Sequence, residues 1–401
     1  MTSVSRAPCA VRWVPMAFPM RFLFLLSGCA AALAAQTVPT TTLAKPDATF
    51  AEPFSNVSGL RELRTGRVVV SDRLERTVSA IDFATGDITP IGREGQGPGE
   101  YGMPGPLLPL GGDSTLMVDF AAMRGLVLVG DRVGPTIPLM AGDGLPFIPR
   151  AVDARGRLYG SSSMMVRGAG GGTAGGSDSV PIRRLDPATS TVDTAAWVRA
   201  AAGGAGGVTV RSGGGSFQVQ TGLRPYAPQD GWAVAPDGRI AVVRPDDYRV
   251  EWIANGERTA GPPMPYTPVT IGKAEKEEWA DAMAGATMMI RTSGGPGGGS
   301  GSSRAARPQR PNVDELEWPA QKPPFETQGV FVTPEGELWI RVSQPAGARR
   351  QRYDVVDGQG RLVRRVELAE DRRLVGFGRG TLYTVRRDAD DLEWLERYRR
   401  P

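Results

Sequence analysis

The sequence predicts an all-β protein: a six-bladed β-propeller with one helical insertion and Gly-rich loops. One observation is a unit that recurs six times, with an apolar run, a turn that contains glycine, and a second apolar run ending in a polar residue. This pattern is typical of β-hairpins, because glycine supplies the positive φ that tight turns need. The other observation is the regular recurrence of the turn glycines, which are Gly66, Gly112, Gly156, Gly238, Gly336 and Gly380.

The intervals between these glycines predict the number of blades. They are 46, 44, 82, 98 and 44 residues, and three of them match the roughly 40–50 residues of a four-stranded blade. The two long intervals contain insertions that account for the excess. Six units and these insertions account for nearly all of the chain after residue 35. The insertions are Gly168–Ser177, Ala200–Ser216 and Thr267–Asn312.

The first 35 residues are predicted to be a signal peptide and not part of the fold. Arg12 and Arg21 precede an apolar run, Phe22 to Ala35, which is shorter than the roughly 20 residues that span a bilayer. A basic start, a short apolar run and small residues at its end are typical of secretory signals. Within the run, Leu26-Ser27-Gly28-Cys29 resembles a bacterial lipobox, so Cys29 is a candidate lipid-attachment site. We expect export to the periplasm or out of the cell, with soluble secretion favoured over a lipid anchor.

Residues 36–401 are predicted to form the propeller as one domain. A third strand follows each hairpin, and a fourth follows in the first five copies. The sixth copy ends at Pro401 before any fourth strand, which would leave an unpaired strand edge. The segment Gln36–Asn56, before the first hairpin, is available as a partner. We expect it to pair with Leu392–Tyr398 and to close the ring.

One helix is predicted, over residues 270–291 of the insertion 267–312. Glu275 lies near its start and Arg291 at its end, as the helix dipole favours. The Gly/Ser/Pro-rich segment that follows, residues 293–311, is predicted to be disordered. The apolar residues of the helix fall on one stripe, which we expect to pack on the propeller: Trp279, Ala282, Met283, Ala286 and Ile290.

A glycine-rich loop, Gly92–Tyr101, lies between two predicted strands. Its glycines suggest a phosphate-binding loop, but it lacks the Gly-Lys-Ser/Thr ending of a P-loop and no helix follows it. Pro98 also removes one amide donor. We interpret the loop as the joint between the first two blades, in which Glu100 accepts backbone hydrogen bonds or pairs with Arg93.

Antiparallel strand order predicts that the long loops share one face. The connections from second to third strands, and from blade to blade, lie on the face opposite the turns between first and second strands. All three insertions and the loop Gly92–Tyr101 belong to this class. Because loops of propellers carry function, we predict that this loop face is the working surface. Its candidate binding residues are Arg93, Glu94, Glu100, Asp72, Asp119, Asp246 and Asp388.

The composition excludes several kinds of chemistry. The chain has no histidine, which removes the commonest general base, imidazole metal ligands and Ser-His-Asp triads. Both cysteines, Cys9 and Cys29, lie in the predicted leader. Carboxylate chemistry and Ca²⁺ bound by oxygen ligands remain, so Ca²⁺ is the one candidate cofactor. We assign no catalytic and no metal residue, because an aspartate at a strand end more often stabilises a turn.

The glycine-rich loop also carries a resemblance. It reads Gly92-Arg93-Glu94-Gly95-Gln96-Gly97-Pro98-Gly99-Glu100-Tyr101, and it resembles the signature of a bacterial family of exported six-bladed β-propellers related to the NHL-repeat type. The family pattern is Gly-x-x-Gly-x-Gly-Pro-Gly-Glu and an aromatic residue, between the first two blades. The helical insertion, Pro323-Pro324 and Leu338-Trp339-Ile340-Arg341 resemble later blades of that family.

This resemblance implies the propeller fold and export, and it supplies no agreed activity. Related NHL-type propellers include lyases and hydrolases that use histidine or Ca²⁺ sites, and this chain cannot supply the histidines. The formal net charge of +4 is small and its residues are scattered, so no nucleic-acid partner is expected.

We therefore favour a non-enzymatic binding or scaffold protein, with an unidentified protein or carbohydrate ligand on the loop face and membrane contact only through a lipid at Cys29. The alternative is a Ca²⁺-assisted hydrolase or lyase that uses carboxylates at the mouth of the propeller channel.

Overall fold

The computed structural model describes residues 38–140, 146–161, 179–199, 209–213, 216–220, 224–292 and 310–401. The predicted signal peptide, with Cys29, lies outside the described residues, and so does the insertion Gly168–Ser177. Most of Ala200–Ser216 and of the segment predicted to be disordered, 293–311, also lies outside them.

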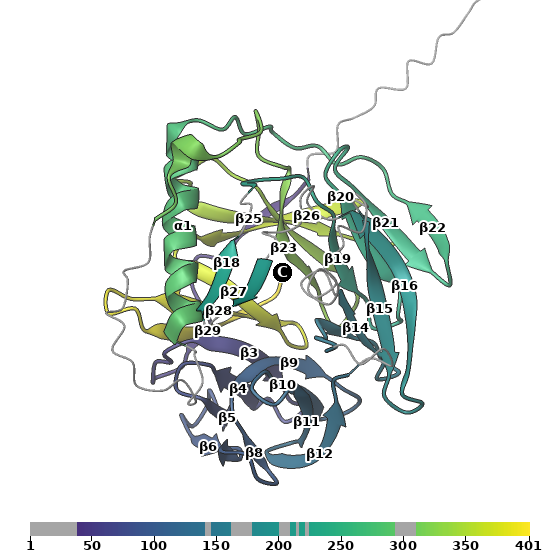
Figure 1. Cartoon of the computed structure of the whole chain (residues 1–401), viewed down its shortest axis with the longest axis vertical. Helices are drawn as coiled ribbons and strands as arrows, with labels where there is room; N and C mark the ends of the chain where they lie inside the picture. Colours follow the sequence, from purple (N-terminus) through teal and green to yellow (C-terminus); the bar gives the residue numbers. More distant parts are fainter. Residues whose placement is uncertain are drawn as a thin grey trace, which may run out of the picture. The chain divides into compact units, whose positions relative to one another are not determined.

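The unit Val38–Pro401 is a six-bladed β-propeller, as predicted (Figure 1). Each blade is an antiparallel sheet. In each of the first three blades, four consecutive strands follow one another from the axis outward. They are β3 (Val57–Glu62), β4 (Val68–Asp72), β5 (Thr77–Ile81) and β6 (Ile88–Pro90) in blade 1; β9 (Pro104–Pro109), β10 (Ser114–Asp119), β11 (Arg124–Val129) and β12 (Arg132–Pro138) in blade 2; β13 (Ala151–Val152), β14 (Leu158–Ser161), β15 (Ser179–Asp186) and β16 (Thr191–Arg199) in blade 3.

Blade 4 follows the same plan, whereas blades 5 and 6 also take strands from the start of the chain. Their strands are β19 (Gly231–Val234), β20 (Ile240–Arg244), β21 (Arg249–Ala254) and β22 (Glu257–Ala260) in blade 4; β23 (Phe325–Val332), β24 (Leu338–Val342), β25 (Arg350–Val356), β26 (Leu362–Ala369) and β1 (Thr40–Thr42) in blade 5; β27 (Arg372–Phe377), β28 (Thr381–Arg387), β29 (Glu393–Arg399) and β2 (Ala48–Thr49) in blade 6. Two short pairs complete the strands: β7 (Arg93–Glu94) with β8 (Glu100–Tyr101), and β17 (Thr209–Gly213) with β18 (Ser216–Gln220).

The six predicted turn glycines all lie between the first and second strands of a blade. Their φ angles run from 66° at Gly380 to 91° at Gly336. L-residues with side chains rarely adopt this region, so glycine is the residue that lets each hairpin close. The prediction of six hairpins is confirmed.

The ring closes as predicted, by a strand from the start of the chain. β2 pairs antiparallel with β29, with Ala48 opposite Arg397 and Thr49 opposite Glu396. Phe50, which is 1% exposed, packs into the cluster between blades 6 and 1. One feature was not predicted: β1 pairs in parallel with β26 and covers the outer edge of blade 5.

Among the described residues, the core consists of six hydrophobic clusters, one at each seam between neighbouring blades. Alternation along the second strands explains this arrangement, since successive side chains of a strand point to opposite faces. In β24, Leu338 and Ile340 pack toward blade 4, and Trp339 packs toward blade 6. Each blade therefore packs against the blades on both sides, and the first strands of the blades line the axis.

Helix α1 (Lys273–Thr292) runs along one side of the ring in Figure 1 and begins three residues later than predicted. The Trp279 ring meets that of Trp318, before β23, at a centroid distance of 5.5 Å, and the Ala346 backbone N–H donates to Glu275 Oε1 at 3.2 Å, so the helix packs on the connection between β24 and β25 of the propeller. The predicted stripe is wrong at Ala282, which is exposed, because the buried face turns toward Ala280. The side chains of Ala286 and Ile290 lie outside the described set. No helix within the described ranges is long and apolar enough to cross a membrane.

Candidate functional site: the axial cavity

A cavity of about 660 Å³ lies on the propeller axis. The first strand of every blade contributes to its wall, so residues from β3 to β27 meet around it. Its lining also includes turns between first and second strands, such as Gly111-Gly112 and Thr333-Pro334. We call the side of the ring that carries these turns the turn face. It is opposite the loop face on which the sequence placed the candidate residues.

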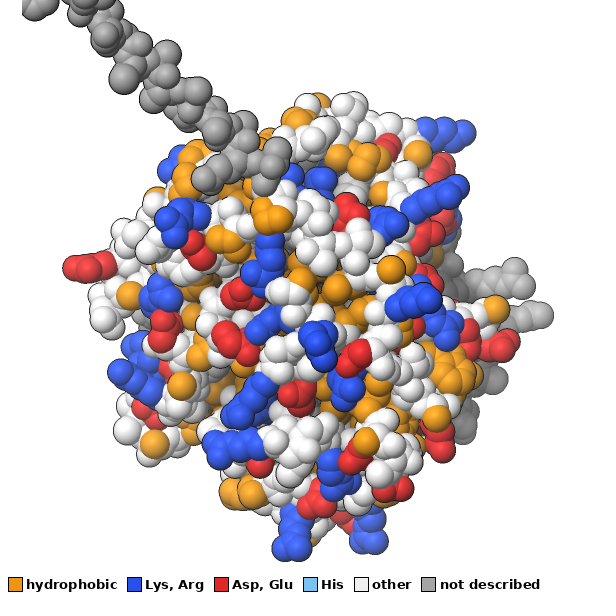
Figure 2. All heavy atoms as spheres, turned by 180° about the vertical axis from the view of Figure 1, so that it is seen from behind, with side chains coloured by type: hydrophobic (Ala, Val, Ile, Leu, Met, Phe, Trp, Pro, Cys, Tyr) orange, Lys and Arg blue, Asp and Glu red, His pale blue; other side chains and the backbone are white. Residues whose placement is uncertain are grey.

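Four arginines and two acidic residues line this cavity. Figure 2 views the molecule from the side opposite to Figure 1 and shows basic and acidic side chains interspersed over that surface. The charged lining residues carry a formal sum of +2, and their placement decides which of them are available to a ligand. They are Arg61, Glu62, Arg64, Arg150, Asp153 and Arg379.

The two carboxylates are occupied by the protein itself. Glu62 accepts hydrogen bonds from the Arg379 backbone N–H at 3.0 Å and from the Tyr383 hydroxyl at 2.6 Å. Asp153 accepts from Arg157 Nε at 2.7 Å and from the Tyr159 hydroxyl at 2.9 Å. Both carboxylates therefore form hydrogen bonds that stabilise the walls of the cavity.

The pKa shifts agree with this structural role. Burial alone would raise the pKa of Asp153, but the hydrogen bonds from Arg157 and Tyr159 outweigh it and lower that pKa. Burial, together with the neighbouring Asp153 carboxylate, raises the pKa of Tyr159 to about 12. Burial and the hydrogen bond to Glu62 also raise the pKa of Tyr383. Asp153 thus stays charged at neutral pH, while the two tyrosines stay protonated.

The arginines near the turn face are less well paired. Arg61 is half-buried and donates from Nη2 to the Gly112 carbonyl at 3.2 Å, but its Nε is buried without a partner among the described atoms. Burial is the largest cause that lowers the pKa of Arg61. The carboxylates of Asp113 and Glu62 act to raise this pKa, and the positive charges of Arg379 and Arg64 act to lower it. The guanidinium groups of Arg64 and Arg379 are exposed and make no hydrogen bond or ion pair with any residue that the structure describes.

Arg150 lies toward the other end of the cavity, beside the start of β13. Its guanidinium is 5.0 Å from the centre of the Trp232 ring, and its Nη2 donates to Gln328 Oε1 at 3.2 Å. The surrounding protein lowers its pKa by burial. A cation and an indole face therefore lie on the same wall, an arrangement that holds the arginine in one orientation.

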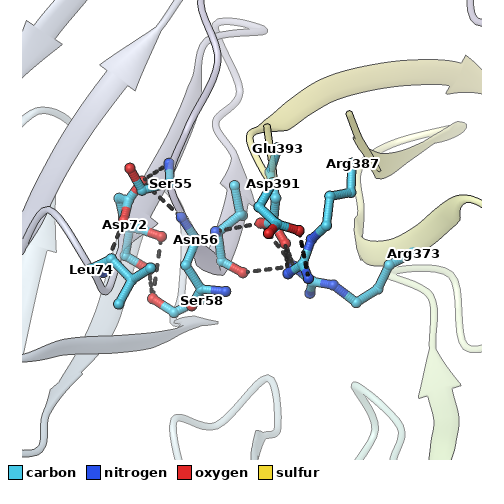
Figure 3. Close-up of polar contacts among 11 residues, drawn as sticks. Ser55, Asn56, Ser58, Asp72, Leu74, Arg373, Arg387, Asp391 and Glu393 are labelled. Atoms are coloured by element: carbon cyan, nitrogen blue, oxygen red, sulfur yellow. Dashed lines mark hydrogen bonds and ion pairs between the residues drawn. The ribbon is translucent and has the colours of Figure 1, made fainter. Parts of the chain in front are cut away.

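Asp72, a predicted candidate, lies on the loop face at the seam between blades 6 and 1 (Figure 3). Its Oδ2 accepts from the backbone N–H groups of Ser55 and Asn56, and its Oδ1 accepts from those of Leu74 and Glu75. Burial raises its pKa, and these amides act in the opposite direction. The carboxylate therefore ties the incoming segment to the turn after β4.

Across that seam, Glu393 performs a related task. It accepts from the Val57 backbone N–H at 2.7 Å and pairs with Arg373 at 2.9 Å, as Figure 3 shows. Both oxygens of Asp72 and both oxygens of Glu393 are engaged by these donors. The carboxylates of Asp72 and Glu393 therefore stabilise the closure of the ring at the seam between blades 6 and 1.

Two other predicted aspartates, Asp119 and Asp388, also accept hydrogen bonds from nearby backbone amides. Asp119 accepts from the amides of Gly102, Met103 and Ala121. Asp388 accepts from the amides of residues 390 and 392 and from Trp394 Nε1 at 2.7 Å. Asp246 is the exception, because it is exposed and pairs with Arg199 of the preceding blade.

The loop Gly92–Tyr101 is the joint between blades 1 and 2. Glu100 accepts from the Gly97 amide and from Arg93 Nε, both at 2.7 Å, as expected. A Cβ at Gly95 would lie 2.2 Å from Glu100 Oε2, so a side chain at this position would displace the folded-back carboxylate. Glu94 pairs with Arg76. The glycines of the motif thus leave space for the Glu100 side chain, which folds back and forms hydrogen bonds within the loop.

The structure places Asp72, Asp119, Asp246 and Asp388 in four different blades and does not bring them together. In the described part of the chain, no three acidic, histidine or cysteine side chains are grouped so as to hold a metal ion. The arginines of the cavity, in contrast, were not among the predicted candidates. The signal that the sequence offers is Arg61, a basic residue within a first strand.

Comparison with known proteins adds the following. No protein-family model matches the sequence, and no curated protein matches it. The solved structures that it resembles are six-bladed propeller proteins. A protein of Bacteroides fragilis NCTC 9343 named for its presumed export is 11% identical, covers 91% of this chain and 100% of its own, and has a TM-score of 0.45.

Two enzymes are at a similar distance. A gluconolactonase from Xanthomonas campestris is 11% identical, with 87% of this chain and 91% of its own covered and a TM-score of 0.41. An aldose sugar dehydrogenase from Streptomyces coelicolor in its PQQ-bound form is 18% identical, with 88% and 97% covered and a TM-score of 0.38. At these identities and TM-scores, none of these proteins assigns an activity to this chain.

Proposed function

We propose that this protein is an exported binding protein that takes up a small polar solute in its axial cavity without altering it chemically. We also propose that it belongs to the exported, NHL-like six-bladed propellers that the loop Gly92–Tyr101 resembles, and that it is secreted in soluble form. The observation that carries the binding function is the cavity itself. It measures about 660 Å³, is surrounded by the first strands of all six blades, and is lined by guanidinium groups that have no ion-pair partner among the described residues.

Several features support this proposal. A volume of several hundred Å³ is the usual size of a small-molecule site. The apolar and backbone parts of the first strands form the wall, while Arg61, Arg64, Arg150 and Arg379 supply a few polar groups that can orient a solute. These polar groups are donors only, since a guanidinium cannot accept a hydrogen bond.

The Ca²⁺-assisted alternative is less well supported. The cavity's two carboxylates, Glu62 and Asp153, are held by hydroxyl, guanidinium and amide donors, so neither of these lining acids is placed as a general base. The loop-face aspartates lie in separate blades. A binding role leaves these carboxylates where they are, whereas carboxylate catalysis would require them to leave their present hydrogen-bond donors.

A plug variant tests the proposal. Ala154 is exposed at the turn-face end of the cavity, so Ala154→Trp should narrow it without touching the core. Melting temperature is measured with glucose, glucuronate and citrate at millimolar concentration. We expect at least one solute to raise it in the wild-type protein, by mass action on the folded state, and not in the variant.

The matched control is Ala84→Trp, an exposed alanine in a strand 3–4 turn of blade 1 on the same face and outside the cavity. It should respond to solutes as the wild type does. A solute response shared by Ala154→Trp would exclude the cavity as the site. A rise in melting temperature with Ca²⁺, or chemical conversion of a solute during incubation, would favour the enzymatic alternative.

A further inference from the structure

We infer that the turn-face end of the axial cavity binds a small oxyanion, a carboxylate- or phosphate-bearing solute, through Arg61, Arg64 and Arg379. This inference rests on the proposed binding function and names its class of ligand. Two guanidinium groups of blade 1 and one of blade 6 line this end, and the acids close to them form no ion pair with them in the described part of the chain.

The blades fix the positions of the three arginines. Arg61 is on β3, and its hydrogen bond to the Gly112 carbonyl ties it to the corresponding turn of blade 2. Arg64 follows in the turn after β3, and its Nη2 would lie 3.7 Å from a Cβ at Gly112. Both guanidinium groups therefore reach the same glycine of the neighbouring blade.

Arg379 comes from the corresponding turn of blade 6. Its backbone N–H donates to Glu62 Oε1 at 3.0 Å, which holds this turn against the end of β3. A Cβ at Gly378 would lie 1.9 Å from Glu62 Oε2, so the glycine permits this close approach. The turns of blades 6, 1 and 2 thus converge on one end of the cavity.

The nearby acids Glu62 and Asp113 offset part of this positive charge, but neither forms an ion pair with the three arginines. Glu62 is bonded to the Arg379 amide and to the hydroxyls of Thr381 and Tyr383. Asp113 accepts from the Arg64 backbone N–H at 2.8 Å. Backbone and hydroxyl donors bind Glu62, and a backbone N–H binds one oxygen of Asp113, while the guanidinium groups of Arg64 and Arg379 have no partner within the described residues.

The chemistry of guanidinium selects the ligand. Its planar fork of N–H donors matches carboxylate and phosphate oxygens in bidentate geometry. Cations that repel one another beside a partly enclosed cavity are stabilised by an anion between them. A cavity of about 660 Å³ admits a small solute and excludes a polyanion such as nucleic acid from its interior.

Calorimetric titration at low ionic strength tests the inference, with citrate and inorganic phosphate as oxyanion probes and glucose as a neutral probe. The variant is Arg64→Gln with Arg379→Gln, two exposed positions where folding should be unaffected. The control is Arg155→Gln: this arginine is exposed on the same face, lacks a side-chain partner in the described part of the chain and does not line the cavity.

We expect one or both oxyanions to bind the wild type, with added NaCl weakening the affinity. The double variant should lose about tenfold or more in affinity, as expected from removing charge-assisted hydrogen bonds, and Arg155→Gln should match the wild type. The two oxyanion arms distinguish a carboxylate site from a phosphate site.

Two results would overturn the inference and leave the binding function standing. One is glucose binding that Ala154→Trp blocks, with no binding of either oxyanion. The other is oxyanion binding that Ala154→Trp blocks but that the double variant retains in full. If no probe, charged or neutral, responds to Ala154→Trp, the proposed function fails together with the inference.

Discussion

Asp153 shows how single carboxylates hold the wall of the cavity. It is 3% exposed, and it joins Arg157 and Tyr159 in the turn that begins blade 3. The first turn of blade 4 holds another aspartate–arginine pair, at a different position of the turn: Asp237 is exposed and pairs only with Arg239 among the described residues. An aspartate–arginine pair is thus buried in one blade and exposed in the next, which allows a comparison of the two.

We predict that Asp153→Asn lowers the free energy of unfolding at pH 7 by about 3 kcal/mol, because breaking a buried pair strands its partner. Asp237→Asn should cost under about 1 kcal/mol, as exposed pairs do. Urea unfolding of both variants measures this difference. Equal effects of the two substitutions would contradict the structural role of Asp153.

The effect of Asp153 should also depend on pH. Its folded-state pKa is lowered, so its stabilisation is present above the unfolded pKa of about 3.9 and is lost as pH falls through the folded value. The difference between the wild type and Asp153→Asn should therefore shrink as the pH is taken below about 4. Unfolding at several acidic pH values measures it.

At the scale of elements, closure of the ring depends on a short strand with few backbone bonds. β2 has two residues, and the side chain of Phe50 that follows it is buried against blades 6 and 1. The rings of Phe54 and Phe83 lie 6.2 and 5.7 Å from that of Phe50. Burial of Phe50 therefore stabilises closure more than the strand pairing alone would.

We predict that Phe50→Ala lowers the free energy of unfolding by about 3–5 kcal/mol, the cost of a cavity in a packed core. Leu74→Ala, at a side chain that is 43% exposed, is the control and should have little effect.

Removal of residues 38–56 should also expose the edge of β29 and promote self-association, measured by size-exclusion chromatography. A truncated protein that stayed monomeric and equally heat-stable would show that closure does not need this segment.

At the scale of the whole molecule, the packed ring buries most of the tyrosines. Seven of the eight have a raised pKa, in each case with burial as the largest cause. Tyr159 and Tyr398, in different blades, are both raised to about 12. Their ionisation is therefore coupled to the packing of the entire ring.

We predict that stability falls steeply in alkali. A raised tyrosine pKa gives stabilisation that is fully present below the unfolded value of about 10 and is lost as pH rises through the folded values. Absorbance at the phenolate band should show few tyrosines titrating near pH 10 and a cooperative step above it, coincident with unfolding. In denaturant, all eight should titrate together near pH 10. Independent titration of the folded protein near pH 10 would contradict the packing of the seams.

The sequence by itself determined the blade count, the hairpin turns and the closing strand, because these depend on local patterns. Positive φ at a turn needs glycine, and a continuous apolar run needs a strand buried on both faces, as in β24. The joint at Gly92–Tyr101 was predictable for the same reason, since Glu100 and its amide partners lie within one short loop.

Only the tertiary structure decided which charged side chains meet. Arg64 and Arg379 lie more than 300 residues apart, and they share one end of the cavity because ring closure sets blade 6 beside blade 1. Asp72 and Asp388 looked available in the sequence and are occupied in the fold by amides and by Trp394. Whether a polar side chain is free for a ligand depends on all of its neighbours, and in a closed ring those neighbours come from distant parts of the chain.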